Sequence, residues 1–284
     1  MAASQLLSSA MPLSSSLSAS SLLIDPNRLH TLLADVAWRF HVDAIATCES
    51  TNTLLLERAE AGAPSGSVIV ADRQTAGRGS RGRQWLASPE ASLTFSVLWS
   101  FAGGMERLAG LSLAVGVAVI QALGACGARG VTLKWPNDIL CRDAKLGGIL
   151  IELQMSGERA QAVIGIGLNL SLPDNVSDAQ GFALPPAALA GLIDPLPDRH
   201  VLFAQLLTAL AEVFYRFSIG GFAAVREQWL KYHAWQDKPV RLLRDGRVEK
   251  EGICRGADAD GALLVETASG VELCLSGDLS LRPL

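Results

Sequence analysis

The stretch Gly77 to Trp85, GRGSRGRQW, combines three glycines with three arginines. Glycines let a backbone wrap closely around a ligand, and arginines supply charge for a polyphosphate or a mixed anhydride. Its first six residues also satisfy G-x-G-x-x-G, the dinucleotide-binding fingerprint, which requires a strand before it and a helix after it. A strand-like alternation follows instead, at 92–99. The loop is therefore expected to bind phosphate without a nicotinamide cofactor; the alternative is a solvated surface turn.

Further ligand-competent groups follow at the ends of predicted strands. KWPND at 134–138 places a cation, an aromatic ring, an amide and a carboxylate at one strand end. KLGG at 145–148 and GIGLN at 165–169 add a lysine and two glycine pairs, on whose backbone a ligand could lie flat. A lone glycine in a strand more often marks a bulge. Two glycine pairs near a phosphate-competent loop favour a binding site.

The elements that must position these groups are a mixture of helices and strands. Periodicity predicts helices near 26–40, 51–62, 108–128, 200–217 and 222–233, and strands near 67–71, 92–99, 131–135, 139–141, 145–153 and 161–170. Strand 92–99 alternates as a half-buried strand would. Without regular βαβ alternation the fold class is α+β. From residue 239 onward, short strands split by turns predict a small barrel.

Composition excludes several functions. The net charge of −4 gives no global basic field for nucleic acid. Five scattered cysteines without a C-x-x-C pair fit a reducing cytosol better than disulfides or zinc, and the four histidines lie away from the glycine-rich motifs. No Lys or Arg precedes Arg28, which argues against a secretory signal. The uncharged stretch 108–128 is expected to be a buried core helix, not a membrane span.

Five blocks carry a resemblance to a known family. CESTN (48–52), QTAGRGSRGRQW (74–85), KWPNDI (134–139), KLGGILIE (145–152) and GIGLNL (165–170), in that order and spacing, resemble the signature blocks of biotin–protein ligases. SGDLSLR at 276–282 resembles the family's C-terminal barrel more weakly. The resemblance implies a mixed β-sheet catalytic domain of the class II synthetase-like biotin/lipoate ligase type, followed by an SH3-like barrel. The expected divisions are a disordered Ser-rich tail at 1–23, the catalytic domain at 24–236 and the barrel at 237–284.

The resemblance also implies a reaction and its residues. The family activates biotin with ATP to biotinyl-5′-adenylate and transfers it to a lysine of the biotin carboxyl carrier domain of acetyl-CoA carboxylase. Expected biotin-binding residues are Ser50, Thr51, Asn52, Gln74, Arg78, Gly79, Ser80, Lys145, Gly147, Gly148, Gly165 and Gly167. Expected ATP- or adenylate-binding residues are Gly77, Arg78, Gly79, Ser80, Arg81, Gly82, Arg83, Trp85, Lys134, Asn137, Asp138 and Asn169.

Within these sets, Lys145, Arg78 and Asp138 are expected to carry the catalysis. Lys145 would neutralise the biotin carboxylate and the α-phosphoryl oxygens. Asp138 would help to remove a proton from the acceptor lysine, and it is the candidate ligand for the Mg²⁺ that accompanies ATP.

Two departures from the family pattern shape the remaining expectations. The family commonly reads G-R-G-R in the loop, whereas the fourth residue here is Ser80, so one phosphate-facing cation is missing unless Arg81 or Arg83 replaces it. The N-terminal segment lacks the helix-turn-helix of the family's repressor members. A cytoplasmic, dedicated ligase without specific DNA or membrane binding is expected, and a homodimer is left open. The alternatives are a lipoate or octanoate ligase and a non-catalytic biotin sensor.

Overall fold

The computed structural model describes residues 22–172, 184–275 and 279–284. Residues 1–21 of the expected Ser-rich tail, and the Ser-Gly-Asp that opens SGDLSLR, lie outside the described residues.

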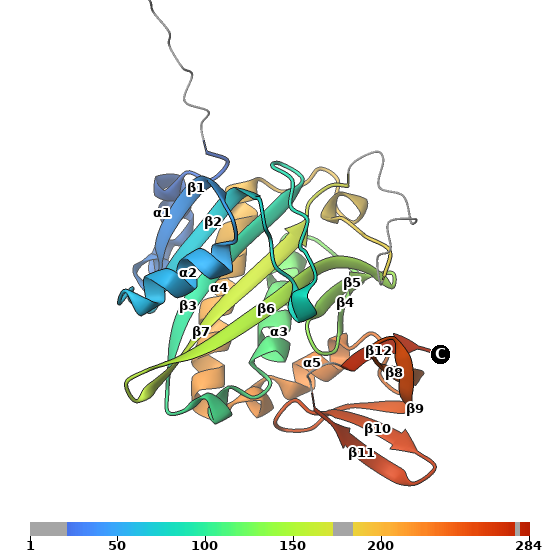
Figure 1. Cartoon of the computed structure of the whole chain (residues 1–284). Coiled ribbons are helices and arrows are strands. Elements are labelled where there is room, and N and C mark those ends of the chain that lie inside the picture. The colour runs from blue at the N-terminus through green and yellow to red at the C-terminus, as the bar shows by residue number, and fades with distance from the viewer. Residues whose placement is uncertain (1–21, 173–183, 276–278) are drawn as a thin grey trace, which may run out of the picture.

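A seven-stranded mixed sheet forms the larger part of the molecule (Figure 1). Its strands are β1 (His41–Cys48), β2 (Ser67–Gln74), β3 (Ser92–Ala102), β4 (Val131–Lys134), β5 (Asp138–Cys141), β6 (Ala144–Ser156) and β7 (Arg159–Asn169). They lie in the order β1-β2-β3-β7-β6-β5-β4, with β1 and β2 parallel and the other neighbours antiparallel. This arrangement confirms the α+β class, since strands β3 to β7 are joined without βαβ crossovers to parallel neighbours.

Helices cover both faces of this sheet unequally. Behind it lie α3 (Leu111–Ala125) and α4 (Arg199–Gly220), with α1 (Pro26–Leu33) and α5 (Arg226–Tyr232) beside α4 and α3. By length and composition Met105–Ala125 and Arg199–Gly220 could each span a membrane, yet 67% and 56% of their apolar stretches are buried in this fold. Their apolar surface packs against the sheet and against each other, as expected for core helices.

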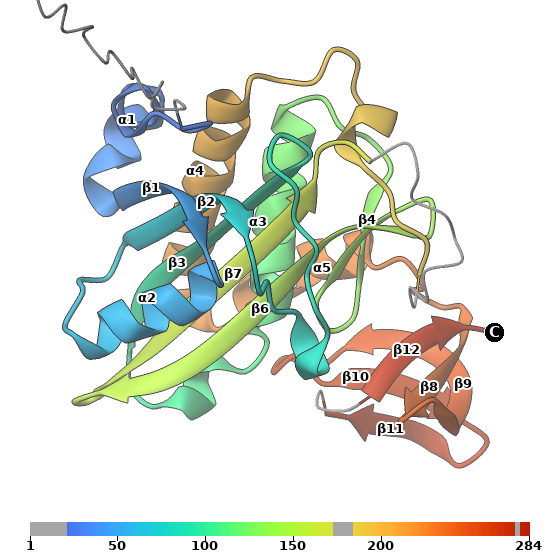
Figure 2. The same cartoon turned by 45° about the horizontal axis from the view of Figure 1, so that its top comes forward.

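The opposite face carries α2 (Thr51–Glu60), as Figures 1 and 2 show. Ser50 caps it by accepting a hydrogen bond from the Thr53 amide, as expected for a serine before a helix. Leu55 and Ala59 of α2 pack on Ile69 and Leu98 in a second, smaller core. Because α2 covers only part of this face, the rest of the sheet surface is left for a site.

The expectation that strand 92–99 is half-buried is wrong. Leu93, Phe95 and Val97 lie against the helices behind the sheet, but Ser96 and Leu98 on the opposite face are buried as well. A two-residue alternation reports which side chains share a face, and it does not report that α2 covers the second face.

The C-terminal residues form a separate antiparallel sheet (Figure 2). Its strands are β8 (Pro239–Arg244), β9 (Arg247–Ala257), β10 (Leu263–Thr267), β11 (Gly270–Cys274) and β12 (Leu279–Pro283), in the order β11-β10-β9-β8-β12. Trp135, which is fully buried, donates a hydrogen bond from Nε1 to the Gly261 carbonyl at 3.0 Å. The KWPND turn therefore fastens the small sheet to the large one.

Candidate active site

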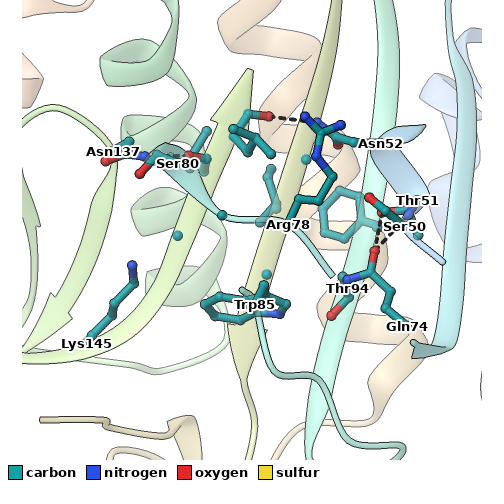
Figure 3. Close-up of a pocket in the computed structure, with 18 residues that line it drawn as sticks. Ser50, Thr51, Asn52, Gln74, Arg78, Ser80, Trp85, Thr94, Asn137 and Lys145 are labelled. Atoms are coloured by element: carbon teal, nitrogen blue, oxygen red, sulfur yellow. Dashed lines mark hydrogen bonds between the residues drawn. The ribbon is translucent and has the colours of Figure 1, made fainter. Parts of the chain in front are cut away.

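A pocket opens on the α2 face of the large sheet, where β3, β7 and β6 lie side by side (Figure 3). It is lined by Ser50, Thr51, Asn52, Gln74, Arg78, Gly79, Ser80, Trp85, Thr94, Phe95, Asn137, Lys145, Gly148, Ile149, Leu150, Gly165, Ile166 and Gly167. Most of the expected biotin-binding residues thus meet at one place, although they come from segments spread over more than a hundred positions of the chain.

Gly148, Gly165 and Gly167 form the floor of this pocket through strand register. Gly165 and Gly167 pair with Ser96 and Thr94 of β3, and Gly148 pairs with Gly167. A Cβ atom on Gly167 would lie 2.4 Å from Cε2 of the Trp85 indole, so that ring rests directly on the backbone. Gly147 differs: its Cβ would meet the Gly167 carbonyl oxygen at 2.6 Å, and it does not line the pocket.

One end of the pocket is rich in hydroxyl and amide groups. Gln74 accepts a hydrogen bond from the Thr51 amide at its Oε1 (2.7 Å), and the Thr51 hydroxyl lies 2.7 Å from that of Ser96. The Thr94 hydroxyl is buried and has no hydrogen-bond partner among the described residues. An unpaired buried hydroxyl beside a pocket is a group that a polar ligand can satisfy.

Sequence reasoning missed Thr94 together with Phe95, Ile149, Leu150 and Ile166. The residues between Ser92 and Trp99 read as an ordinary strand, in which Thr94 and Ser96 both occupy polar positions of the alternation. That Thr94 faces Gly167 depends on the pairing of β3 with β7, which is a long-range contact.

The arginine-rich loop is closed on itself. The Trp85 amide donates to the Gly77 carbonyl at 2.9 Å, and the Gly79 amide donates to the Arg83 carbonyl at 2.7 Å. A Cβ on Gly77 would lie 2.4 Å from the Trp85 carbonyl oxygen, so this closure requires glycine. Among the described residues a short 3₁₀ turn, Ser80–Gly82, and then β3 follow, and no α-helix begins at the loop. The dinucleotide fingerprint therefore lacks its helix, as the sequence predicted.

The loop arginines point to different places. Arg78 lines the pocket, whereas Arg81 lines a second cavity of about 390 Å³ bounded by the start of α3, by β6 and by the turn at Gly261. Arg83 donates to the Ser80 carbonyl at 3.2 Å and to the Ser80 hydroxyl at 3.0 Å. Of the expected loop residues, Gly77, Arg81, Gly82 and Arg83 do not line the first pocket. Ser80 and Asn137 line both cavities, so the two are adjacent.

The other end of the pocket is charged. Asp138 lies between two lysines, with Oδ2 at 2.5 Å from Lys134 Nζ and Oδ1 at 2.6 Å from Lys145 Nζ. A β-bulge between β5 and β6 breaks the alternation after Ile139, so that Lys145 lies on the same face as Gly148. Lys145 reaches the pocket, while Lys134 and Asp138 are buried behind it.

The pKa values of this cluster follow from burial and charge. Burial lowers the pKa of Lys134 to about 8, against the raising effect of Asp138. Burial tends to raise the pKa of Asp138, but the Lys134 and Lys145 ammonium groups together hold it well below its usual range. Asp138 is therefore an anion that orients two cations, and it is a weak base.

The same geometry bears on Mg²⁺. The Asp138 carboxylate already contacts two ammonium groups, and nowhere in residues 22–172, 184–275 and 279–284 do three His, Cys, Asp or Glu side chains gather to hold a metal ion. The residues present do not fit a protein-built magnesium site, and the expectation of Asp138 as a metal ligand is not supported.

The two asparagines of the motifs support the backbone. Asn137 lines the pocket and donates to the Ile149 carbonyl at 2.8 Å. Asn169 donates to the carbonyls of Lys145 (3.3 Å) and Ala187 (3.0 Å) and does not line the pocket. Asn169 thus holds the strand end that carries Lys145.

Comparisons with known proteins agree with this geometry. The Biotin/lipoate A/B protein ligase family matches residues 44–169, and the Biotin protein ligase C terminal domain matches residues 237–282. The Bifunctional ligase/repressor BirA of Salmonella typhimurium is 36% identical over 263 residues, covering 92% of this chain and 79% of that protein. The Biotin–[acetyl-CoA-carboxylase] ligase of Paracoccus denitrificans is 34% identical over 229 residues, covering 80% and 94%.

The fold is also similar to solved structures. The biotin protein ligase from Aquifex aeolicus, in complex with biotin and ATP, matches with a TM-score of 0.73 and 28% identity. The match covers 86% of this chain and 99% of that one, so it includes both sheets.

Proposed function

The chain belongs to the biotin/lipoate A/B protein ligase family, and from that premise we propose that it activates biotin with ATP to biotinyl-5′-adenylate and transfers biotin to a lysine of a biotin carboxyl carrier domain. The observation that carries the proposal is the pocket itself. A glycine floor runs from a polar end at Thr51 and Gln74 to a cation at Lys145, and an arginine-bearing loop lies over it.

The pocket suits a molecule with a polar ring at one end and a carboxylate at the other. A buried ureido group needs partners for its N–H and C=O groups, which the hydroxyl- and amide-rich end supplies. Figure 3 shows Lys145 and Asn137 on the side of the pocket opposite Thr51 and Gln74, with Trp85 between them. A bound carboxylate would thus lie near Lys145 and close to the loop.

The first step then needs no nucleophile from the protein. The biotin carboxylate attacks the α-phosphorus of ATP, and pyrophosphate leaves. Catalysis consists of holding the two substrates together and stabilising the spreading negative charge. Lys145 is the side chain placed for that task, and Arg78 of the loop is the second candidate.

The second step needs a neutral acceptor lysine, whose deprotonation at pH 7 costs about 4.6 kcal/mol from a free pKa near 10.4. Asp138 was the expected helper. Because its carboxylate is buried between Lys134 and Lys145, we assign it to positioning Lys145 instead.

Several finer features belong to the same proposal. ATP would bring its own Mg²⁺, and the carrier would be that of acetyl-CoA carboxylase, the substrate in the name of the Paracoccus relative. The proposed divisions are a catalytic domain to residue 236 and a barrel from 237, supported by the two separate sheets. Five free cysteines support a reducing, cytoplasmic setting. Specific DNA or membrane binding is not part of the proposal, and a homodimer remains to be tested.

The testing experiment is ATP–pyrophosphate exchange by the purified chain with biotin, lipoate or octanoate supplied separately. Exchange that depends on biotin alone is expected, and biotin transfer to a carrier domain should follow. Exchange with lipoate or octanoate would move the assignment to the lipoate branch. Biotin binding without exchange would identify a biotin sensor.

A further inference from the structure

Glu152 ends the KLGGILIE block, and nothing in the activation chemistry uses it. It lies on β6 at the same alternation as Gly148 and Leu150, and its side chain is only 23% exposed. Its Oε1 accepts a hydrogen bond from Arg78 Nη2 at 2.8 Å, and its Oε2 accepts one from Asn52 Nδ2 at 2.9 Å. Figure 3 shows Arg78 reaching back toward Asn52 at the pocket edge. The two oxygens of one carboxylate therefore join the loop to α2.

The connection continues inward from Asn52. Since a carboxylate only accepts hydrogen bonds, the Asn52 amide nitrogen must face Glu152, which leaves its oxygen toward Ser96 Oγ at 2.6 Å. The Ser96 hydroxyl also lies 2.7 Å from the Thr51 hydroxyl, which itself donates to Gln74 Oε1 at 3.1 Å. A continuous chain of hydrogen bonds thus runs from Thr51, at the ring-binding end, to Arg78 in the loop.

These hydrogen bonds leave Asn52 little capacity to bind a ligand. Its second N–H faces the Leu150 carbonyl at 3.4 Å, and a Cβ on Gly165 would lie 2.2 Å from its oxygen. Asn52 was expected to hold the biotin ring. The structure instead favours Asn52 as a link between the Thr51 end of the pocket and Glu152.

We propose that Glu152 is a positioning residue that couples occupancy of the ring-binding end to the position of Arg78, so that biotin and nucleotide strengthen each other's binding. The proposal rests on the proposed function. Thr51 is assigned to biotin alone, whereas Arg78 is assigned to the nucleotide as well, and the hydrogen-bonded series through Glu152 joins them. Coupling of this kind is reciprocal, with a typical factor of about 5–150 between the two affinities.

The competing explanation is an ordinary surface ion pair. The Arg78 side chain is 48% exposed, and exposed ion pairs contribute little to stability. If that were all, replacing Glu152 would leave both ligand affinities and their coupling unchanged. The test must therefore measure coupling and not stability.

The experiment is calorimetric titration of biotin with and without α,β-methylene-ATP, whose methylene bridge prevents pyrophosphate from leaving. The wild-type chain should bind biotin about fivefold or more tightly when the analogue is present. Glu152→Gln keeps the shape but has one acceptor oxygen, so one of the two links must break. The ratio of biotin dissociation constants should then fall to about one.

Two further variants make the test specific. Asn52→Ala interrupts the next link and should abolish the coupling to the same extent. Glu60→Gln, at an exposed position in α2, should keep the wild-type ratio. Circular dichroism melts show that each variant is folded.

A wild-type ratio of one, or an unchanged ratio in Glu152→Gln, would overturn the proposal. Pyrophosphate exchange by the wild-type chain tests the function separately: exchange with an unchanged ratio overturns the coupling alone, whereas absent biotin binding overturns both.

Discussion

Lys134 and Asp138 form an ion pair inside the protein, with Nζ 2.5 Å from Oδ2 and with only 4% and 5% of the two side chains exposed. Both come from the KWPND motif, four positions apart across the β4–β5 turn. The motif therefore places a buried carboxylate, Asp138, that holds the Lys145 ammonium group at the end of the pocket.

Replacing Asp138 by asparagine should therefore harm both stability and activity. Loss of the anion leaves the Lys134 ammonium buried and unpaired, which costs about 3–5 kcal/mol of unfolding free energy. Urea denaturation at pH 7 measures the loss, and exchange should fall as Lys145 loses its anchor. Glu249→Gln, which breaks the exposed Arg244–Glu249 pair, is the control and should change stability by less than about 1 kcal/mol. Equal losses of unfolding free energy in the two variants would show that the buried pair contributes no more to stability than the exposed pair.

Lys145→Met should lower biotin-dependent pyrophosphate exchange by about 100- to 1000-fold, because a positioned cation stabilises charge in the transition state. Lys145 is 27% exposed, and its loss leaves the Lys134–Asp138 pair in place, so the melting temperature should change little. Initial exchange rates at saturating substrates measure the effect. A loss smaller than about tenfold would transfer the role to another cation.

Gly167→Ala should weaken biotin binding and displace Trp85. The added methyl group would lie 2.4 Å from the indole, which cannot share that space. Calorimetry should show a dissociation constant for biotin that is at least tenfold larger, a loss of about 1.4 kcal/mol of binding free energy. The fluorescence emission of Trp85 should shift to the red as the ring becomes solvated. Gly124→Ala, in α3 with nothing within 4 Å of its Cβ position, is the matched control. It should leave binding unchanged and stabilise the helix by up to about 1 kcal/mol.

Ser80→Arg should slow release of the adenylate. Ser80 lines both cavities, so a guanidinium at this position can reach phosphate and supply the cation that this chain lacks. The release rate of preformed biotinyl-adenylate, followed after dilution, should be lower in the variant. An intermediate that leaves the wild-type chain no faster than the variant would show that Ser80 does not limit retention.

His233 should make the fold sensitive to acid. Burial lowers the pKa of His233 to about 3, so the folded state keeps it neutral while the unfolded chain binds a proton below its usual pKa near 6.5. The contribution of His233 to the free energy of unfolding is fully present above pH 6.5 and is lost as the pH falls toward 3. At pH 5 the loss is about 2 kcal/mol.

Urea denaturation of His233→Gln at pH 7.5 and pH 5 checks this, because the variant should lose less stability between the two pH values than the wild type. His30→Gln, at an exposed position, should behave as the wild type does. The same pH dependence in all three proteins would show that other groups cause it.

Much of the site could be predicted from local sequence. The GRGSRGRQW loop needs glycine where its backbone closes on Trp85, and CESTN places a capping serine at the start of α2. These requirements act within a few residues, so residue type and spacing reveal them. Most helices and strands follow for the same reason, from periodicity within each segment, but strand β1 (His41–Cys48) was not predicted.

Residue roles within the site depended on contacts between distant segments. Gly147 and Gly148 are identical in type and adjacent in sequence, yet only Gly148 faces the pocket, because strand pairing and a bulge set the face. The position of Thr94 in the pocket could not be predicted from the sequence, because it depends on the pairing of β3 with β7.

The sequence by itself therefore determined most of the elements, the loop and the family of chemistry, because each depends on local conformation and on residue type. Only the tertiary structure decided that Asp138 orients Lys145 and that Glu152 joins Asn52 to Arg78. Such roles depend on which partner lies within about 3 Å of a side chain, and distance in space is set by the packing of the whole chain.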